Sequence, residues 1–167
     1  MVEVIMPFPD VLGLSWGLSR QECSARLASV TLKQTDSYII ASMPTNSKSI
    51  NVELLFKNEI GLWKIQVVLY KSRSFWEDYT TDDLEYTMAE SKRAYEETIQ
   101  LYISELGPPD FTGDWGDENY PIDQNAWSIC CWNQPQERLQ IEYEQPDKEF
   151  PFFVRVVTYH VNSSPNS

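Results

Sequence analysis

The chain has 167 residues, of which 25 are acidic, 13 basic and one a histidine, so its formal net charge is −12. Nothing in it supplies the cluster of Lys and Arg that nucleic acid or an anionic bilayer requires, which argues against both as partners. Apolar residues make up 42% and aromatic residues 13% of the chain, which is enough for the packed core of one domain.

The N-terminal segment and the apolar pattern predict a soluble, cytoplasmic protein. Residues 1–10 lack a positively charged start and are interrupted by Pro7 and Pro9, so they fit neither a signal peptide nor a lipid anchor. The sequence also lacks a run of about 18 apolar residues, the minimum for a transmembrane helix. The three cysteines are odd in number and lack C-x-x-C spacing, so we interpret them as buried thiols rather than as a disulfide framework or a zinc site.

The first half of the chain predicts a short helix followed by strands. Ser19-Arg20-Gln21-Glu22 is a capping-box pattern, so a helix is expected over residues 20–28. The apolar period then changes from helical to alternating, which predicts two short strands at residues 30–32 and 38–43.

A hairpin is the clearest pattern of this half. Four apolar residues, Ile50, Val52, Leu54 and Phe56, alternate with Asn51, Glu53 and Leu55. Residues 58–61 supply a turn, and Trp63 begins a second alternating strand on its apolar face. Val68 and Tyr70 lie on the other side of that second strand. We therefore expect it to be covered on both faces, as a central strand is.

A long helix is predicted over residues 81–106. The acidic residues Asp82 and Asp83 favour the positive end of the helix dipole, and Gly107 followed by two prolines ends the helix. Apolar side chains recur at helical spacing and form one stripe: Leu84, Met88, Tyr95, Ile99, Tyr102 and Leu106.

After the long helix, residues 110–125 are expected to form an acidic loop. Strand patterns then return in three stretches, 126–132, 139–144 and 152–161. In the middle stretch Leu139 and every second residue after it alternate with Gln140 and Glu142, which predicts one buried and one solvated face.

This order predicts an α+β fold, because runs of consecutive strands favour antiparallel meanders over βαβ crossovers. We expect one antiparallel sheet of roughly six to seven strands, packed by one long helix and one short N-terminal helix. Residues 1–161 then form a single domain and residues 162–167 a polar tail. A second interpretation divides the domain into two α-β-β-β halves, residues 10–72 and 80–161, which share no residue-level identity.

Two short patterns resemble a group of bacterial domains. Gly13-Leu-Ser-Trp-Gly-Leu-Ser-Arg-Gln-Glu22 resembles the G-x-x-x-G-[ML]-[ST]-x-x-E opening of SmpA/OmlA-type and β-lactamase-inhibitory-protein-like domains. Tyr102-Ile-Ser-Glu-Leu-Gly-Pro-Pro109, then Trp127, then Leu139-Gln-Ile-Glu-Tyr143 follow the group's order of helix, L-G-x-P, loop, Trp and strand. The resemblance implies a helix-plus-antiparallel-sheet module with a binding role and no catalysis. It transfers no functional residue, and the group's lipoprotein cysteine and signal are absent.

The residues available for catalysis are few, and we expect the protein not to be an enzyme. His160 is the only histidine, and its place at the end of a strand pattern favours the surface over a general base. Neither a G-x-S-x-G elbow nor a phosphate-binding glycine motif occurs. We also expect no metal and no cofactor, since residues 114–119 misplace the glycine of a calcium loop and put Trp115 where a ligand belongs.

Acidic and aromatic residues gather in two segments, one on each side of the long helix. This mixture combines aromatic anchoring area with a field that attracts a basic partner. The candidate partner-binding residues are Trp76, Glu77, Asp78, Tyr79, Asp82, Asp83, Asp114, Trp115, Asp117, Glu118 and Tyr120. The competing interpretation is that the aromatic side chains fold back to cover the sheet.

The sequence therefore predicts a non-catalytic acidic protein of the immunity or inhibitor type, which blocks a basic protein partner such as a toxin or nuclease. Two alternatives remain open. One is a small-molecule binding module that holds an apolar or aromatic ligand among its tryptophans. The other is an enzyme that uses carboxylates, or one of the three cysteines paired with His160.

Overall fold

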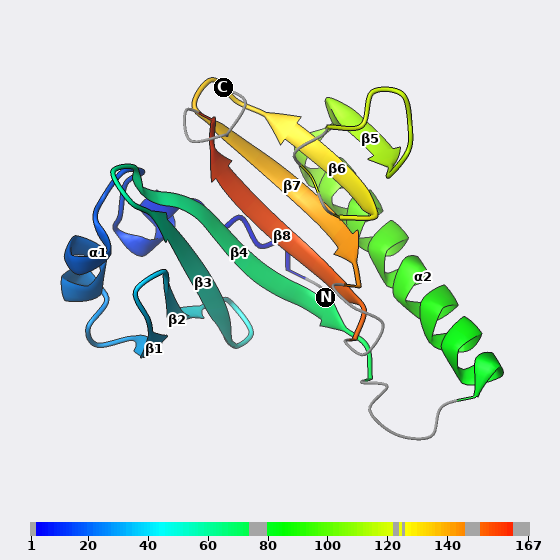
Figure 1. The fold of residues 1–167 in the computed structure, drawn as a ribbon, viewed down its shortest axis with the longest axis horizontal. Coiled ribbons are helices and arrows are strands. Elements are labelled where there is room, and N and C mark those ends of the chain that lie inside the picture. The colour runs from blue at the N-terminus through cyan, green and yellow to red at the C-terminus, as the bar shows by residue number, and fades with distance from the viewer. Residues whose placement is uncertain (1–2, 74–79, 122–123, 125, 146–150, 162–167) are drawn as a thin grey trace. The chain divides into compact units, whose positions relative to one another are not determined.

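The computed structural model describes residues 3–73, 80–121, 124, 126–145 and 151–161, and it shows the predicted α+β fold (Figure 1). The eight described strands lie in one sheet in the order β1-β2-β3-β4-β8-β7-β6-β5, one or two strands more than predicted. The chain forms two compact units. Unit 1 comprises residues 1–67, 134–139 and 157–167, and unit 2 comprises residues 68–133 and 140–156.

Unit 1 begins with the 3-10 helix η1 (Pro9–Leu12), which the sequence does not predict. The predicted elements follow it: helix α1 (Arg20–Arg26) and strands β1 (Thr31–Gln34), β2 (Tyr38–Pro44), β3 (Ser49–Lys57) and the start of β4 (Gly61–Lys71). The capping box of α1 is confirmed, because the Ser19 hydroxyl accepts the Glu22 N–H and the Glu22 carboxylate accepts the Ser19 N–H at 2.8 Å.

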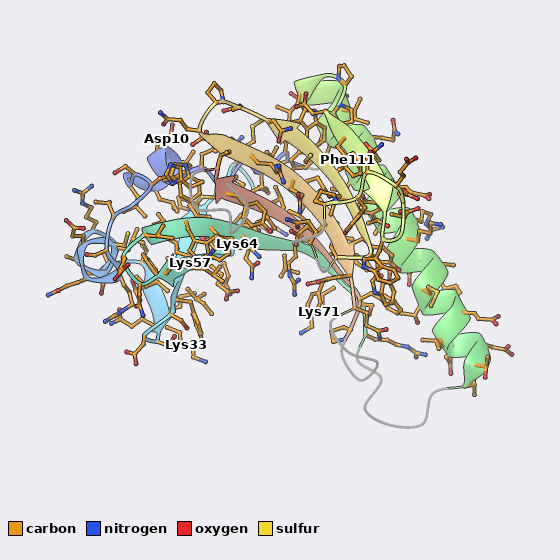
Figure 2. The ribbon with its side chains drawn as sticks, turned by 45° about the horizontal axis from the view of Figure 1, so that its top comes forward. Asp10, Lys33, Lys57, Lys64, Lys71 and Phe111 are labelled. Atoms are coloured by element: carbon orange, nitrogen blue, oxygen red, sulfur yellow. The ribbon has the colours of Figure 1, made fainter. Side chains whose placement is uncertain are left out.

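A β-bulge in the β3–β4 hairpin corrects the predicted face of β4. Leu55 pairs with Lys64 and Phe56 with Leu62, so Trp63 is the extra residue. Leu62 is therefore buried in place of Trp63, and the Lys57 ammonium lies 3.7 Å from the centroid of the Trp63 ring. Figure 2 labels Lys57 and Lys64 on these adjacent strands. The expectation that Val68 is covered is wrong, since its side chain is 45% exposed.

The core of unit 1 is built from aliphatic side chains on alternating strand positions. Each strand of the β2–β3 pair contributes every second residue, as antiparallel pairing with one buried face requires. The fully buried members are Ile39, Ala41, Val52, Leu54, Leu62 and Ile65.

Unit 2 contains helix α2 (Thr81–Leu106), β5 (Phe111–Asp114), β6 (Ser128–Asn133) and most of β7 (Glu137–Glu144) and β8 (Phe153–His160). Helix α2 has the predicted bounds. Its buried face differs from the predicted apolar stripe in the N-terminal half of the helix, where Thr87 and Ser91 are buried and Met88 is 42% exposed. No described helix combines the length and apolar composition needed to cross a membrane.

Two further predictions for unit 2 are wrong. Residues 111–114, expected in a loop, form β5, which pairs antiparallel with β6 in the register Thr112 to Cys130. Gln140 and Glu142, expected on a solvated face of β7, are 0% and 5% exposed. The Gln140 amide donates to Gln124 Oε1 and Glu142 Oε1, both at 2.8 Å, so the loop residue Gln124 helps to cover this face.

Candidate functional site

The net charge of the chain is confined to one unit. Unit 1 contains seven basic and seven acidic residues, whereas unit 2 contains six basic and eighteen acidic residues and so carries the whole formal charge of −12. A field able to attract a basic partner therefore originates in unit 2.

Within unit 2, the acidic loop after β5 is held by its own carboxylates. We call residues 114–120 the Trp115 loop. The Asp114 carboxylate accepts the Ser128 hydroxyl at 2.6 Å, and the Asp117 carboxylate accepts the Asp114 N–H at 2.7 Å. The Trp115 N–H donates to the Trp127 carbonyl at 2.7 Å, which fixes the loop to the segment before β6.

The two aromatic residues of the Trp115 loop have different surroundings. Tyr120 is half-buried, meets Phe111 edge to face at 6.4 Å between ring centroids, and donates its hydroxyl to the Ala126 carbonyl. Burial raises the pKa of Tyr120 to about 12, and the nearby carboxylates act in the same direction. Trp115, in contrast, is 73% exposed. Tyr120 therefore supports the loop, and Trp115 is presented to solvent in the same loop as the exposed Glu118.

The other acidic segment is described only from the start of α2 onward. Asp83 is part of a capping box, because its carboxylate accepts the Thr80 N–H at 3.2 Å, and it also meets the Arg73 guanidinium at 3.1 Å. These contacts lower the pKa of Asp83, with the Thr80 N–H as the largest cause. Asp82 is exposed on the same turn. The remaining candidates of this segment lie outside the described residues: Trp76, Glu77, Asp78 and Tyr79.

The described parts of the two acidic segments do not meet. Helix α2 has 26 residues and so rises about 39 Å. Figure 1 shows β5 alongside the helix well away from its start, which carries Asp82 and Asp83. The Trp115 loop and the start of α2 are therefore two separate acidic regions of unit 2.

A pocket of about 580 Å³ opens in unit 1 beside η1. Its walls come from η1 and the segment after it, the turn between β6 and β7, and the end of β8. The apolar lining consists of Phe8, Pro9 and Leu14. The other lining residues are polar or carry a polar ring atom: Asp10, Ser15, Trp16, Gln134, Gln136, Glu137 and His160.

Trp16 connects three walls of this pocket. Its indole N–H donates to Glu137 Oε1 at 2.8 Å, and its ring stacks on the His160 imidazole at 5.7 Å between centroids and 11° between planes. The Trp16 segment is fixed to β4, because Gly17 N–H donates to the Leu62 carbonyl at 3.0 Å. A Cβ at Gly61 would lie 2.3 Å from the Gly17 carbonyl oxygen, so glycine is required for this close approach.

No sequence motif predicts this pocket. The sequence predicts His160 at the surface, whereas it is half-buried in the pocket wall, and Glu137 and the two glutamines belong to no motif. Trp16 and Glu137 are separated by 121 positions, and no local pattern links residues so far apart. The only usable signal was a lone histidine at the end of a strand.

The thiols are buried, as predicted. Burial raises the pKa of Cys23 to about 11 and raises that of Cys130, whose sulfur also accepts the Thr112 hydroxyl at 3.4 Å. Both thiols are therefore protonated and weakly nucleophilic at neutral pH. Within the part of the chain that the structure describes, no three His, Cys, Asp or Glu side chains gather in a way that could hold a metal ion.

Comparisons with protein-family models, with curated proteins and with solved structures return no match for this chain.

Proposed function

We propose that this protein is a non-catalytic binding protein of the immunity or inhibitor type, and that it blocks a basic protein partner through the Trp115 loop. The observation that carries the proposal is the 73% exposure of Trp115 in a loop that also contains Asp114, Asp117 and Glu118. A large aromatic side chain exposed on a hydrogen-bonded loop offers an anchor without a large ordering cost on binding.

The charge distribution supports a basic partner. Unit 2 has an excess of twelve acidic over basic residues, and the Trp115 loop alone contributes Asp114, Asp117 and Glu118. Such a field speeds association with a positively charged protein and makes the rate sensitive to salt. The sequence resemblance to β-lactamase-inhibitory-protein-like domains supports the same class of function.

The order of elements supports the proposed internal repeat. Helix α1 is followed by β1 to β4 and helix α2 by β5 to β8, and the sheet order runs outward from β4 and β8 to β1 and β5. We therefore propose two halves of α-β-β-β-β form, with one strand more in each than the sequence suggested. In this proposal, the halves share a scaffold and differ in the surfaces they present.

The test is affinity capture at low salt from a lysate of the source organism, with quantitative comparison of four variants. Trp115→Ala and Glu118→Lys should each reduce recovery of the same basic protein. If Trp115 is an anchor, Trp115→Ala should raise the Kd by about 30-fold. Tyr86→Ala and Glu96→Lys are matched controls, because they make equivalent changes at exposed positions of α2. Recovery of an identical set of proteins with all four variants would reject the proposal.

A second candidate function is small-molecule binding, and the pocket beside η1 favours it. About 580 Å³ is within the range of ligand sites, and the lining combines apolar side chains with convergent polar groups. This function uses unit 1 alone, so it can be tested independently of the Trp115 loop.

A further inference from the structure

We propose that the pocket of unit 1 binds a small organic cation of the guanidinium or amidinium class, an inference that rests on the second candidate function above. The proposal follows from the charge and geometry of the lining. Two carboxylates, Asp10 and Glu137, belong to the lining, and none of the described lining residues is lysine or arginine. An anion would meet two carboxylates and, among the described lining residues, no lysine or arginine.

The carboxylates have acceptor capacity for a donor-rich ligand. Glu137 accepts the Trp16 indole N–H at 2.8 Å and Asp10 accepts the Val11 N–H at 3.0 Å. A carboxylate has about four acceptor positions, so these contacts orient the two groups without saturating them. A purely apolar ligand would remove water from both carboxylates and return no hydrogen bond, which is unfavourable.

The aromatic stack selects a planar cation. Trp16 and His160 lie parallel, and both rings are half-buried in the pocket wall. Guanidinium and amidinium groups are planar, stack on aromatic rings, and present paired N–H donors that match a carboxylate. Gln134 and Gln136 are exposed members of the lining, and their amide oxygens are further acceptors.

The pocket is preorganised for such a ligand. The Gln134 N–H donates to the Glu137 carbonyl at 2.8 Å, and the Val161 N–H donates to the Gln136 carbonyl at 3.0 Å. The Thr158 hydroxyl donates to the Pro7 carbonyl at 2.7 Å, which ties the segment before η1 to β8. Because these hydrogen bonds hold the segments that carry the lining residues, binding requires little ordering of the lining.

Titration of the full chain with benzamidine and with its neutral isostere benzamide tests the proposal. Binding is followed by NMR at the Trp16 indole N–H signal, which is assigned by its loss in Trp16→Phe. We expect benzamidine to shift this signal and to bind at least about tenfold more tightly than benzamide, since a charged hydrogen bond to a carboxylate is lost in the isostere. The other indole signals report that the fold is unchanged.

Two variants test whether Glu137 and Asp10 supply the negative charge that binds benzamidine. Glu137→Gln keeps an acceptor oxygen for the Trp16 indole, and Asp10→Asn keeps one for Val11, so each removes charge with little change in shape. Each should weaken benzamidine binding by about tenfold, and Asp36→Asn, an exposed change in unit 1 outside the lining, should have no effect. Equal binding of benzamide and benzamidine, or a response to methyl glucoside instead, would overturn the cation class but leave small-molecule binding standing. No response to any of the three probes would overturn both.

Discussion

The two units of this chain differ in the side chains they bury and in their net charge. No aromatic side chain is buried among the described residues of unit 1, whereas unit 2 buries Tyr95, Tyr102, Trp132, Tyr143 and Phe152. Unit 2 also holds six of the seven described buried polar residues and all of the net charge. Aliphatic side chains pack without directional contacts, so a small movement of one of them costs little. Buried aromatic and polar groups depend on ring contacts and hydrogen bonds with particular neighbours. Unit 2 should therefore be the more sensitive unit to substitution, pH and salt.

The largest expected effect comes from removing one ring of the aromatic core. Phe152 is fully buried, with ring centroids 5.7 Å from Trp127 and 6.0 Å from Tyr143. Phe152→Ala should lower the free energy of unfolding by about 3–5 kcal/mol, and Leu54→Ala in the aliphatic core by about 2–5 kcal/mol. Near-UV circular dichroism separates the two, because only Phe152→Ala should change the signal of the packed rings. Equal near-UV spectra would contradict the contrast between the cores.

The next prediction uses two glutamines that face a carboxylate at the same distance. Gln140 donates to Glu142 at 2.8 Å in the interior of unit 2, and Gln66 donates to Glu53 at 2.8 Å on the half-buried surface of unit 1. Gln140→Glu places two carboxylates together in the interior and should cost about 3 kcal/mol or more at pH 7. Gln66→Glu makes the same change with solvent access and should cost less than about 1 kcal/mol.

Denaturant unfolding at pH 7 and pH 5 checks this pair. The loss in Gln140→Glu should shrink at the lower pH, because protonation of one carboxylate removes the repulsion. The loss in Gln66→Glu should change little. If both variants lost the same stability at pH 7, burial would not be the cause.

A part of the fold is predictable from sequence when neighbouring residues determine it. The bounds of α2, the cap of α1 and the β3–β4 hairpin depend on neighbouring residues, and the sequence predicts all three. The burial of Gln140 depends on Gln124 reaching it from a loop, which no strand pattern encodes. Alternation identifies the two faces of a strand and cannot tell whether a second layer covers the polar one.

The candidate sites show the same limit. The acidic composition around Trp115 is a local property, so the sequence identifies that loop, although it does not reveal that Asp114 and Asp117 hold the loop together. The sequence does not predict the short strand β5, because its four residues include Gly113 and pair only at the edge of the sheet. The pocket of unit 1 joins residues from both ends of the chain, and no local pattern predicts it.

The smallest expected effect concerns the two capping boxes, one in each unit. Ser19→Ala and Thr80→Ala should each cost about 1 kcal/mol. The consequences should differ, because α1 has seven residues and α2 has 26. A helix of two turns depends on its cap for nucleation, while a long packed helix frays only at its first turn. Hydrogen exchange should therefore show loss of protection throughout α1 in Ser19→Ala, and at the first amides of α2 alone in Thr80→Ala.

The carboxylates of these two caps make the stability that each cap contributes depend on pH. The pKa of Glu22 lies below its ordinary value of 4.5, chiefly because the Ser19 N–H donates to it, and that of Asp83 lies below 3.8, chiefly because of the Thr80 N–H. A lowered pKa means that the folded state binds fewer protons than the unfolded state. The stability from each cap is therefore fully present above the ordinary value and is lost as the pH falls through the folded value. Glu22→Gln should flatten the acid limb of stability below pH 4.5, and Asp83→Asn should flatten it below pH 3.8, each in hydrogen exchange of its own helix. An acid limb that stayed as steep in Asp83→Asn as in the parent chain would show that the cap of α2 contributes no pH-dependent stability.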